Sequence, residues 1–183
     1  MGPETGMTGT RRKRPLRPVV RAAGWAIALY ACWMGMQAVH EAGHVLHAAA
    51  SGGRVARVEL PPLGFSRTDL SINPRPAFVA WGGAVWGVLL PLAVWGLCRV
   101  LCRRRGRSVA RGLQFFAGFC LVANGAYLGV GWVDRVGDAG DLLRRGTPVW
   151  VLVAYSLVAV SGGLLLWHRL DAARGSGGAG GKE

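Results

Sequence analysis

Acidic residues are scarce in this chain. Nine Asp and Glu stand against 22 Lys and Arg, and only 17% of the 183 residues are charged. Hydrophobic residues make up 51% of the sequence, and its mean hydropathy is +0.30. A soluble helical bundle shows a polar stripe along every helix, and this sequence has few polar residues from which to build one. The composition therefore argues against an ordinary soluble domain and favours a membrane protein.

Disulfide bonds and a cleaved leader are two further features that the sequence does not support. Its four cysteines, Cys32, Cys98, Cys102 and Cys120, lie within or at the ends of apolar stretches, which is a poor arrangement for a disulfide framework. The first apolar run is longer than the core of a signal peptide, and no clear small-x-small cleavage site precedes the HEAGH segment within it. We therefore interpret this run as a retained membrane span.

Four long apolar stretches are present, at residues 19–50, 77–101, 109–133 and 147–170. About 20 apolar residues in a helix cross a hydrocarbon core of about 30 Å, and each stretch reaches that length. The sequence thus predicts an all-α membrane protein with about four transmembrane helices, which form one domain over residues 19–170. Residues 1–18 and 171–183, rich in Gly, Pro, Arg, Thr or Ser, are predicted to be disordered tails.

Basic residues gather in alternate loops. With the N-terminus placed in the cytoplasm, fifteen Lys and Arg lie on the cytoplasmic side and seven on the other. This asymmetry predicts that both termini are cytoplasmic. The runs RRKR and CRRRGR are then topology signals and contacts to anionic lipid, and no nucleic-acid partner is expected. The abundance of Arg, Ala and Gly indicates a GC-rich bacterial genome, and hence the inner (plasma) membrane.

The segment AVHEAGHVLHAAA places titratable groups at the end of the first apolar stretch. His40 and His44 are four residues apart, so on a helix they share a face and can bind one metal ion. Glu41 is poorly placed to be a ligand, but it can take a proton from an attacking water and deliver it to a leaving amine. Peptide-bond hydrolysis by zinc is the usual chemistry of this spacing. The alternative is a hydrogen-bonded polar cluster that only ties helices together.

A third histidine follows one helical turn later. Proteases with three histidine ligands need Gly at position 47 and His at position 50, whereas this chain has His47 and Ala50. That class is excluded. We interpret His47 as an interfacial residue or as a support behind the metal ligands.

A catalytic zinc site usually has three protein ligands, so a carboxylate is needed in addition to the histidines. Glu59 and Asp69 follow in the first loop, and VDRVGDAGDLLRRG after the third span offers Asp134, Asp138 and Asp141. Two membrane crossings separate the ends of the first and third spans. The HEAGH and GDAGD segments are therefore expected near the same membrane face.

These motifs resemble the site-2 protease family of intramembrane zinc metalloproteases, over about residues 25–145. HEAGHVLHAAASGGRVARVEL is similar to the zinc helix of that family and the strand after it, and GGAVWGVLLPLA to its glycine-rich helix. The resemblance implies a Zn²⁺ ion held by His40, His44 and an Asp near the start of a later helix. Asp138 is the best match, with Asp141 as the alternative. It also implies a zinc-dependent endopeptidase with Glu41 as the catalytic base.

Two further segments complete the expected site. The alternating, β-branched residues 55–60 predict a short strand or hairpin in the loop after the zinc helix, which in the family can pair with an unwound substrate. Asn124, in the third span, is a candidate for binding substrate backbone, although a helix-packing role suits it equally. The expected partners are a membrane-protein substrate, the lipid bilayer, and a regulatory membrane protein or a second copy of the chain.

Two alternatives remain open on the sequence. A membrane protein of the same architecture could bind metal without cleaving anything, as a regulator or scaffold. Ionisable residues inside spans also occur in transporters of ions or protons, but this chain shows no repeat symmetry of the kind that many transporters have.

Overall fold

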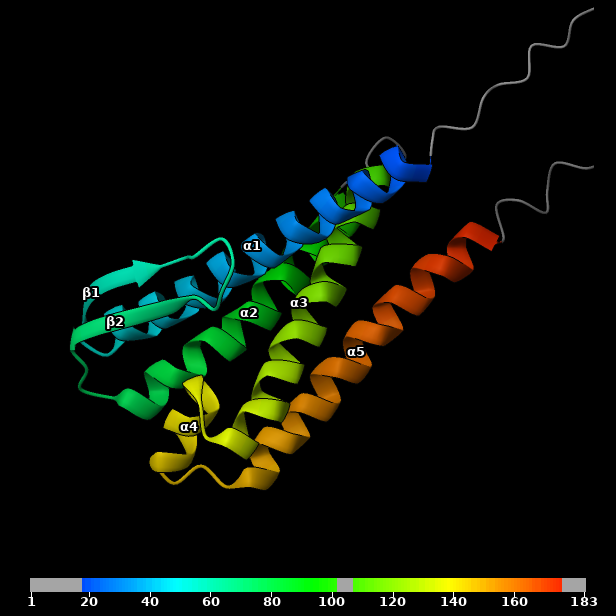
Figure 1. Cartoon of the computed structure of the whole chain (residues 1–183). Coiled ribbons are helices and arrows are strands. Elements are labelled where there is room, and N and C mark those ends of the chain that lie inside the picture. The colour runs from blue at the N-terminus through cyan, green and yellow to red at the C-terminus, as the bar shows by residue number, and fades with distance from the viewer. Residues whose placement is uncertain (1–17, 102–106, 176–183) are drawn as a thin grey trace, which may run out of the picture. The chain divides into compact units, whose positions relative to one another are not determined.

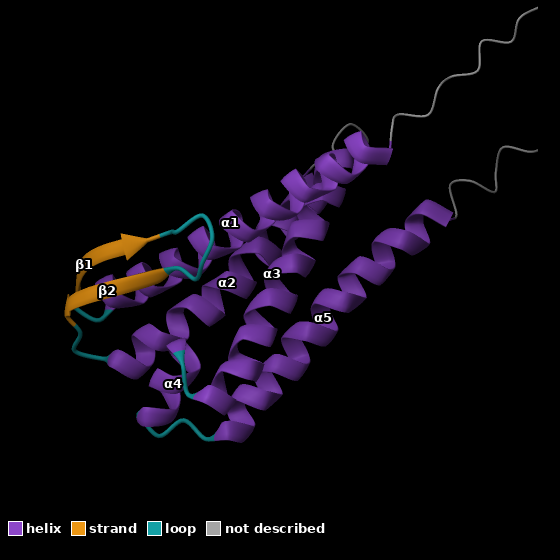
Figure 2. Ribbon diagram, in the orientation of Figure 1, coloured by secondary structure: helices purple, strands orange, loops and turns teal. Residues whose placement is uncertain are grey.

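The computed structural model describes residues 18–101 and 107–175, and within them the chain is helical apart from one hairpin (Figures 1 and 2). The elements in chain order are α1 (Pro18–Ala50), β1 (Arg54–Glu59), β2 (Arg67–Ile72), α2 (Pro76–Leu101), α3 (Arg107–Asp134), α4 (Gly137–Arg144) and α5 (Val149–Gly175). Helices α1, α2, α3 and α5 are long and apolar enough to cross a membrane. The predicted class, an all-α membrane protein with four spans and a hairpin, is confirmed.

The chain divides into two compact units, Met1–Ala31 and Cys32–Glu183, and α1 begins in the first unit. The described part of the first unit is the start of this helix, whose side chains are exposed. Most residues of the two predicted tails, and part of the CRRRGR run, lie outside the described residues. Helix α5 continues to Gly175, beyond the predicted end of the last span at residue 170.

The core of the second unit forms where α2, α3, α4 and α5 meet. Helix α3 packs against both α2 and α5 (Figure 1). Small and medium-sized side chains fill the space between these four helices: Ala80, Ala84, Leu128, Ala139, Leu142 and Leu152. Because lipid tails are as apolar as these residues, close van der Waals packing and hydrogen bonds hold such helices together. One such bond runs from Tyr155 Oη to the carbonyl of Ala84, at 2.7 Å.

The hairpin between α1 and α2 is antiparallel, with Glu59 opposite Arg67 at its turn end. Its first strand, Arg54–Glu59, confirms the strand predicted at residues 55–60. Its second strand carries polar residues on alternate positions, so one face can turn toward α1 while the other meets solvent. Figure 2 shows the hairpin lying along α1.

Helix α4 is a short element that the four predicted spans do not include. Arg135 and Gly137 both have positive φ, of 55° and 53°, and this reverses the chain after α3. Gly140 then lies so close to the backbone carbonyl of Arg135 that no side chain would fit there. As a result, α4 turns Ala139 and Leu142 into the core and leaves Asp138 in its first turn.

A candidate metal centre

His40 and His44 lie on the part of α1 that contacts α2. Both side chains are buried, and the helices approach so closely that a Cβ on either Gly43 or Gly82 would collide with the backbone of the other residue. Glycine at both positions is what permits this approach. The two histidine rings are therefore held against α2 and away from lipid.

Each histidine is oriented through its Nδ1 atom. His44 Nδ1 is 2.8 Å from the carbonyl oxygen of Val79, and His40 Nδ1 is 2.6 Å from Asn124 Oδ1. The amide of Asn124 donates through Nδ2 to the carbonyls of Cys120 and Gly87, so its oxygen must face His40. An oxygen of either kind only accepts, so both Nδ1 atoms carry hydrogen. In neutral rings, both Nε2 atoms then present lone pairs.

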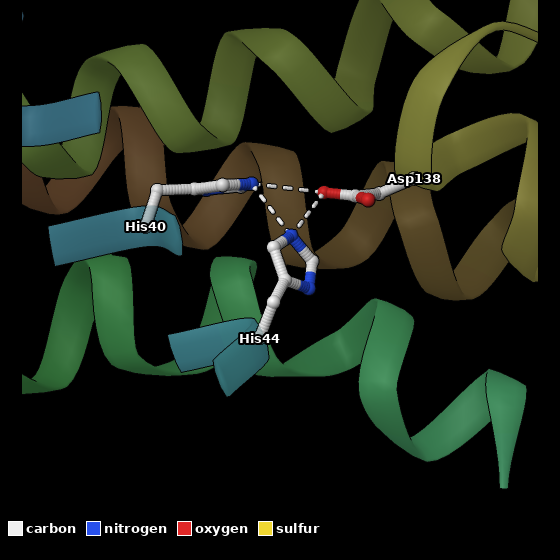
Figure 3. A group of neighbouring side chains, drawn as sticks. All are labelled: His40, His44 and Asp138. Carbon is white, nitrogen blue, oxygen red and sulfur yellow. Dashed lines mark hydrogen bonds and ion pairs between the residues drawn. The ribbon is translucent and has the colours of Figure 1, made fainter. Parts of the chain in front are cut away.

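Asp138 completes a group of three ligand atoms (Figure 3). Its Oδ2 lies 2.9 Å from His40 Nε2 and 3.2 Å from His44 Nε2, and the two Nε2 atoms are 3.1 Å apart. Of the residues that the structure describes, these three form the one group of His, Cys, Asp or Glu able to share a metal ion. The aspartate predicted as the third ligand is thus the one that meets the histidines.

The donor set and its spacing fit a zinc ion. Zinc in a tetrahedral site binds nitrogen and oxygen at about 2.0–2.2 Å, which places neighbouring ligand atoms about 3.3 Å apart. The three distances seen here are close to that value. Three lone-pair atoms that converge in this way form an arrangement that a bound cation would stabilise.

Space beside the two nitrogens is provided by α2. A Cβ at Gly83 would lie against His40 Nε2 and His44 Nε2, so the absence of a side chain leaves this position open. Gly87, one turn later, similarly gives room to the side chain of Asn124. Gly83 and Gly87, four residues apart on α2, therefore both make room for side chains of the site.

Asp138 is held in place from α3. Its backbone N–H donates to the hydroxyl of Tyr127 at 3.2 Å, and Gly137 lies so close to that hydroxyl that a side chain there would collide with it. Burial raises the pKa of Asp138, but when the His40 and His44 rings are protonated, their Nε2–H groups and positive charge outweigh burial and hold the pKa well below its usual range. The carboxylate is thus kept ionised, as a metal ligand must be.

Glu41, the predicted catalytic base, points to the hairpin. Its side chain is buried, and both carboxylate oxygens accept hydrogen bonds of 2.6 Å, Oε1 from Ser66 Oγ and Oε2 from Thr68 Oγ1. A buried carboxylate needs such partners. Sequence reasoning missed both hydroxyl residues, because no local signal links them to a glutamate on a different element.

A cavity of about 280 Å³ opens beside the ligand group. Side chains of α1, the hairpin and α4 line it, among them His40, Glu41, Ser66, Thr68 and Asp138. The proposed base and the ligand atoms therefore face one common space. Asn73, in the Asn-Pro-Arg-Pro segment that leads into α2, also lines this cavity.

The remaining candidates lie apart from the ligand atoms. Asp141 accepts a 2.6 Å ion pair from Arg144 and is exposed, although it lines the cavity. His47 bonds through Nδ1 to the carbonyl of Phe78 and stacks on that ring, so it ties α1 to the start of α2. Glu59 and Asp69, the carboxylates of the hairpin, both pair with Arg67.

Asn124 lies behind His40. All three of its hydrogen bonds go to His40 and to backbone carbonyls, and the side chain is 1% exposed. This arrangement orients the ring of His40, as is typical of residues that support metal ligands. Its predicted contact with substrate stays a prediction.

Comparisons with known proteins identify no relative of this chain. No family model matches the chain, and neither the curated proteins nor the solved structures give a significant match.

Proposed function

We propose that this chain is a zinc-dependent intramembrane endopeptidase, which hydrolyses a peptide bond in or near a membrane-spanning substrate. The mutual approach of His40 Nε2, His44 Nε2 and Asp138 Oδ2 to about 3 Å carries this proposal. Glu41 faces the same cavity, and α1 is long and apolar enough to span a membrane. Ionisable groups in such a helix are costly and are a sign of function.

The residues divide the work of hydrolysis among them. When bound, zinc polarises the scissile carbonyl and acidifies water. His40, His44 and Asp138 supply its ligands, and Asn124 and the Val79 carbonyl hold the rings. Glu41 removes a proton from the attacking water as the carbon–oxygen bond forms. It then gives that proton to the nitrogen as the peptide bond breaks, so the products are one carboxyl and one amino terminus.

The location of the reaction follows from the same proposal. The chain lies in a bacterial plasma membrane with both termini in the cytoplasm, which the excess of basic residues in alternate loops supports. A substrate helix must unwind before its peptide bond becomes accessible. The hairpin borders the cavity through β2, where an extended segment could pair with it.

Two measurements test the proposal. Elemental analysis of the purified chain should show about one zinc per molecule in the wild type and little in His44→Ala. Comparison of membrane proteomes from cells that carry the wild type or Glu41→Gln should then reveal single-span proteins that accumulate only in the variant. Absence of zinc from the wild type, or identical proteomes, contradicts the proposal.

A second candidate function is a metal-binding regulator or scaffold that cleaves nothing. The observation that favours it is the double hydrogen bond on Glu41, since a carboxylate bound at both oxygens also occurs as a purely structural group. Incubation of candidate single-span proteins with the wild type and Glu41→Gln distinguishes the two. Equal processing by both supports the regulator.

A further inference from the structure

The residues that lead into β2 contact both α1 and α3. The ring of Phe65 lies 5.9 Å from Trp33 on α1 and 6.2 Å from Tyr127 on α3, measured between centroids. Tyr127 is the residue whose hydroxyl accepts the backbone N–H of Asp138. The segment Phe65–Thr68 therefore contacts α1, which carries Glu41, and α3, which carries the tyrosine bonded to Asp138.

Alternation along this strand separates two kinds of side chain. Ser66 and Thr68, two residues apart, both point to α1 and donate to Glu41. Between and after them, Arg67 and Asp69 are exposed and pair with one another at 3.4 Å. The alternating pattern thus places the hydroxyl groups of Ser66 and Thr68 on the side that faces α1. Each hydroxyl group donates to a different oxygen of the Glu41 carboxylate.

The bonds to Glu41 are short, and they leave capacity for a proton. Both are 2.6 Å, within the range of about 2.5–2.7 Å for a hydroxyl bound to a carboxylate. Each carboxylate oxygen has two lone pairs, so a single accepted bond leaves the other available. A carboxylate held at both oxygens keeps one orientation, whereas an unrestrained glutamate side chain samples several rotamers.

We propose that Ser66 and Thr68 are positioning residues, whose hydroxyl groups hold the Glu41 carboxylate in the orientation that the reaction requires. This role rests on the proposed function. It makes the hairpin part of the catalytic arrangement, because a shift of β2 would remove both donors from the base together. Both hydroxyls act through Glu41.

The test uses the full zinc-loaded chain in liposomes, with a single-span reporter protein that carries a fluorescent protein at each end. In the double variant Ser66→Ala/Thr68→Val, kcat should fall at least about tenfold with KM and zinc content unchanged, since a positioned base contributes about 10²–10⁴-fold. The conservative variant Ser66→Thr/Thr68→Ser retains both hydroxyls and should recover most of the rate. Ser71→Ala is the matched control, because Ser71 lies on the same strand and donates only to the Arg54 carbonyl.

An infrared measurement reports on the contact directly. The difference spectrum of the wild type minus Glu41→Gln isolates the carboxylate band of Glu41, and loss of two hydroxyl donors should shift it. An unshifted band, an unchanged or higher kcat in the double variant, or no recovery in the conservative variant overturns the positioning role. A reporter that stays intact with the wild type, or is cleaved equally by Glu41→Gln, contradicts the proposed function and this role with it.

Discussion

Asp138 and Asp141 lie one helical turn apart on α4, yet their surroundings differ completely. Asp138 faces two histidine nitrogens at 2.9 and 3.2 Å, whereas Asp141 is exposed and paired with Arg144. A surface pair of this kind contributes little, about 0–1 kcal/mol. The roles of the two carboxylates are therefore separable by substitution.

Replacement of Asp138 should abolish zinc binding. We expect Asp138→Ala to weaken zinc binding more than about 100-fold, because even residues that only support ligands cost about 10–100-fold when removed. Asp141→Ala is the matched control and should keep the wild-type zinc content. Titration of the metal-free chains with zinc measures the affinity of both variants. A greater loss of affinity in Asp141→Ala than in Asp138→Ala would show that Asp141, and not Asp138, is the ligand.

Removal of the Asn124 amide should weaken zinc binding without eliminating it. The variant Asn124→Leu has nearly the same volume but leaves His40 Nδ1 without its acceptor, so we expect about 10–100-fold lower affinity. Gln114→Leu, on the same helix, removes only a bond to the carbonyl of Leu166 and should bind zinc like the wild type. Equal zinc affinity in both variants would show that Asn124 does not orient the histidine.

At the level of whole elements, the face that α2 turns to the histidines is defined by the absence of side chains. Gly82 admits the backbone of α1, Gly83 leaves room beside both Nε2 atoms, and Gly87 accommodates Asn124. These three glycines share one side of the helix at spacings of one, four and five residues. A single added methyl group therefore acts on the metal position itself.

The variant Gly83→Ala should lose zinc while the helices still form. Its Cβ would occupy the space next to His40 and His44, and alanine is a better helix former than glycine by up to about 1 kcal/mol. Gly96→Ala, on the same helix, meets no atom within 4 Å and is the control. Circular dichroism together with zinc analysis separates the two effects. Full zinc occupancy in Gly83→Ala would contradict the assigned geometry.

The long elements were predictable because lipid imposes a minimum apolar length on each span, and the sequence meets it four times. The short ones were not. Helix α4 reads GDAGDLLR, in which two glycines weaken the helical pattern, and contacts with α3 and α2 stabilise it instead. Similarly, β2 is six residues of mixed polarity, whose pairing with β1 depends on the hairpin register.

The candidate site likewise contains residues that the sequence predicts and residues that it does not. His40, Glu41 and His44 follow from local spacing, because one helix sets their geometry. Ser66 and Thr68 contact Glu41 across 25 and 27 residues, and that contact depends on how the hairpin folds back on α1. For the third ligand, the resemblance to a family favoured Asp138, and only the turn at Arg135 and Gly137 explains why Asp141 points elsewhere.

For the molecule as a whole, the proposed orientation determines which side of the membrane the cavity faces. The hairpin and α4 flank the cavity, and both belong to loops that follow an outward crossing if the N-terminus is cytoplasmic. The metal centre would then open toward the extracytoplasmic side. Substrates would be cleaved near their outer ends.

Cysteine labelling tests this orientation. A membrane-impermeant maleimide should label Arg54→Cys, at the exposed start of β1, in intact cells. Arg105→Cys, in the segment between α2 and α3, is the control and should react only after the cells are opened. Because native cysteines lie in or beside apolar stretches, the unsubstituted chain provides the background. The reverse pattern would place the termini outside.

The sequence separation of 98 positions between His40 and Asp138 has a consequence for biogenesis. A ribosome-bound chain that has inserted α1 alone exposes two histidines with no carboxylate to join them, and the site is absent until α3 has entered the bilayer and α4 has folded back. If the proposed function holds, metal loading follows membrane insertion in time, and an unfinished chain would carry no hydrolytic centre within the translocation machinery.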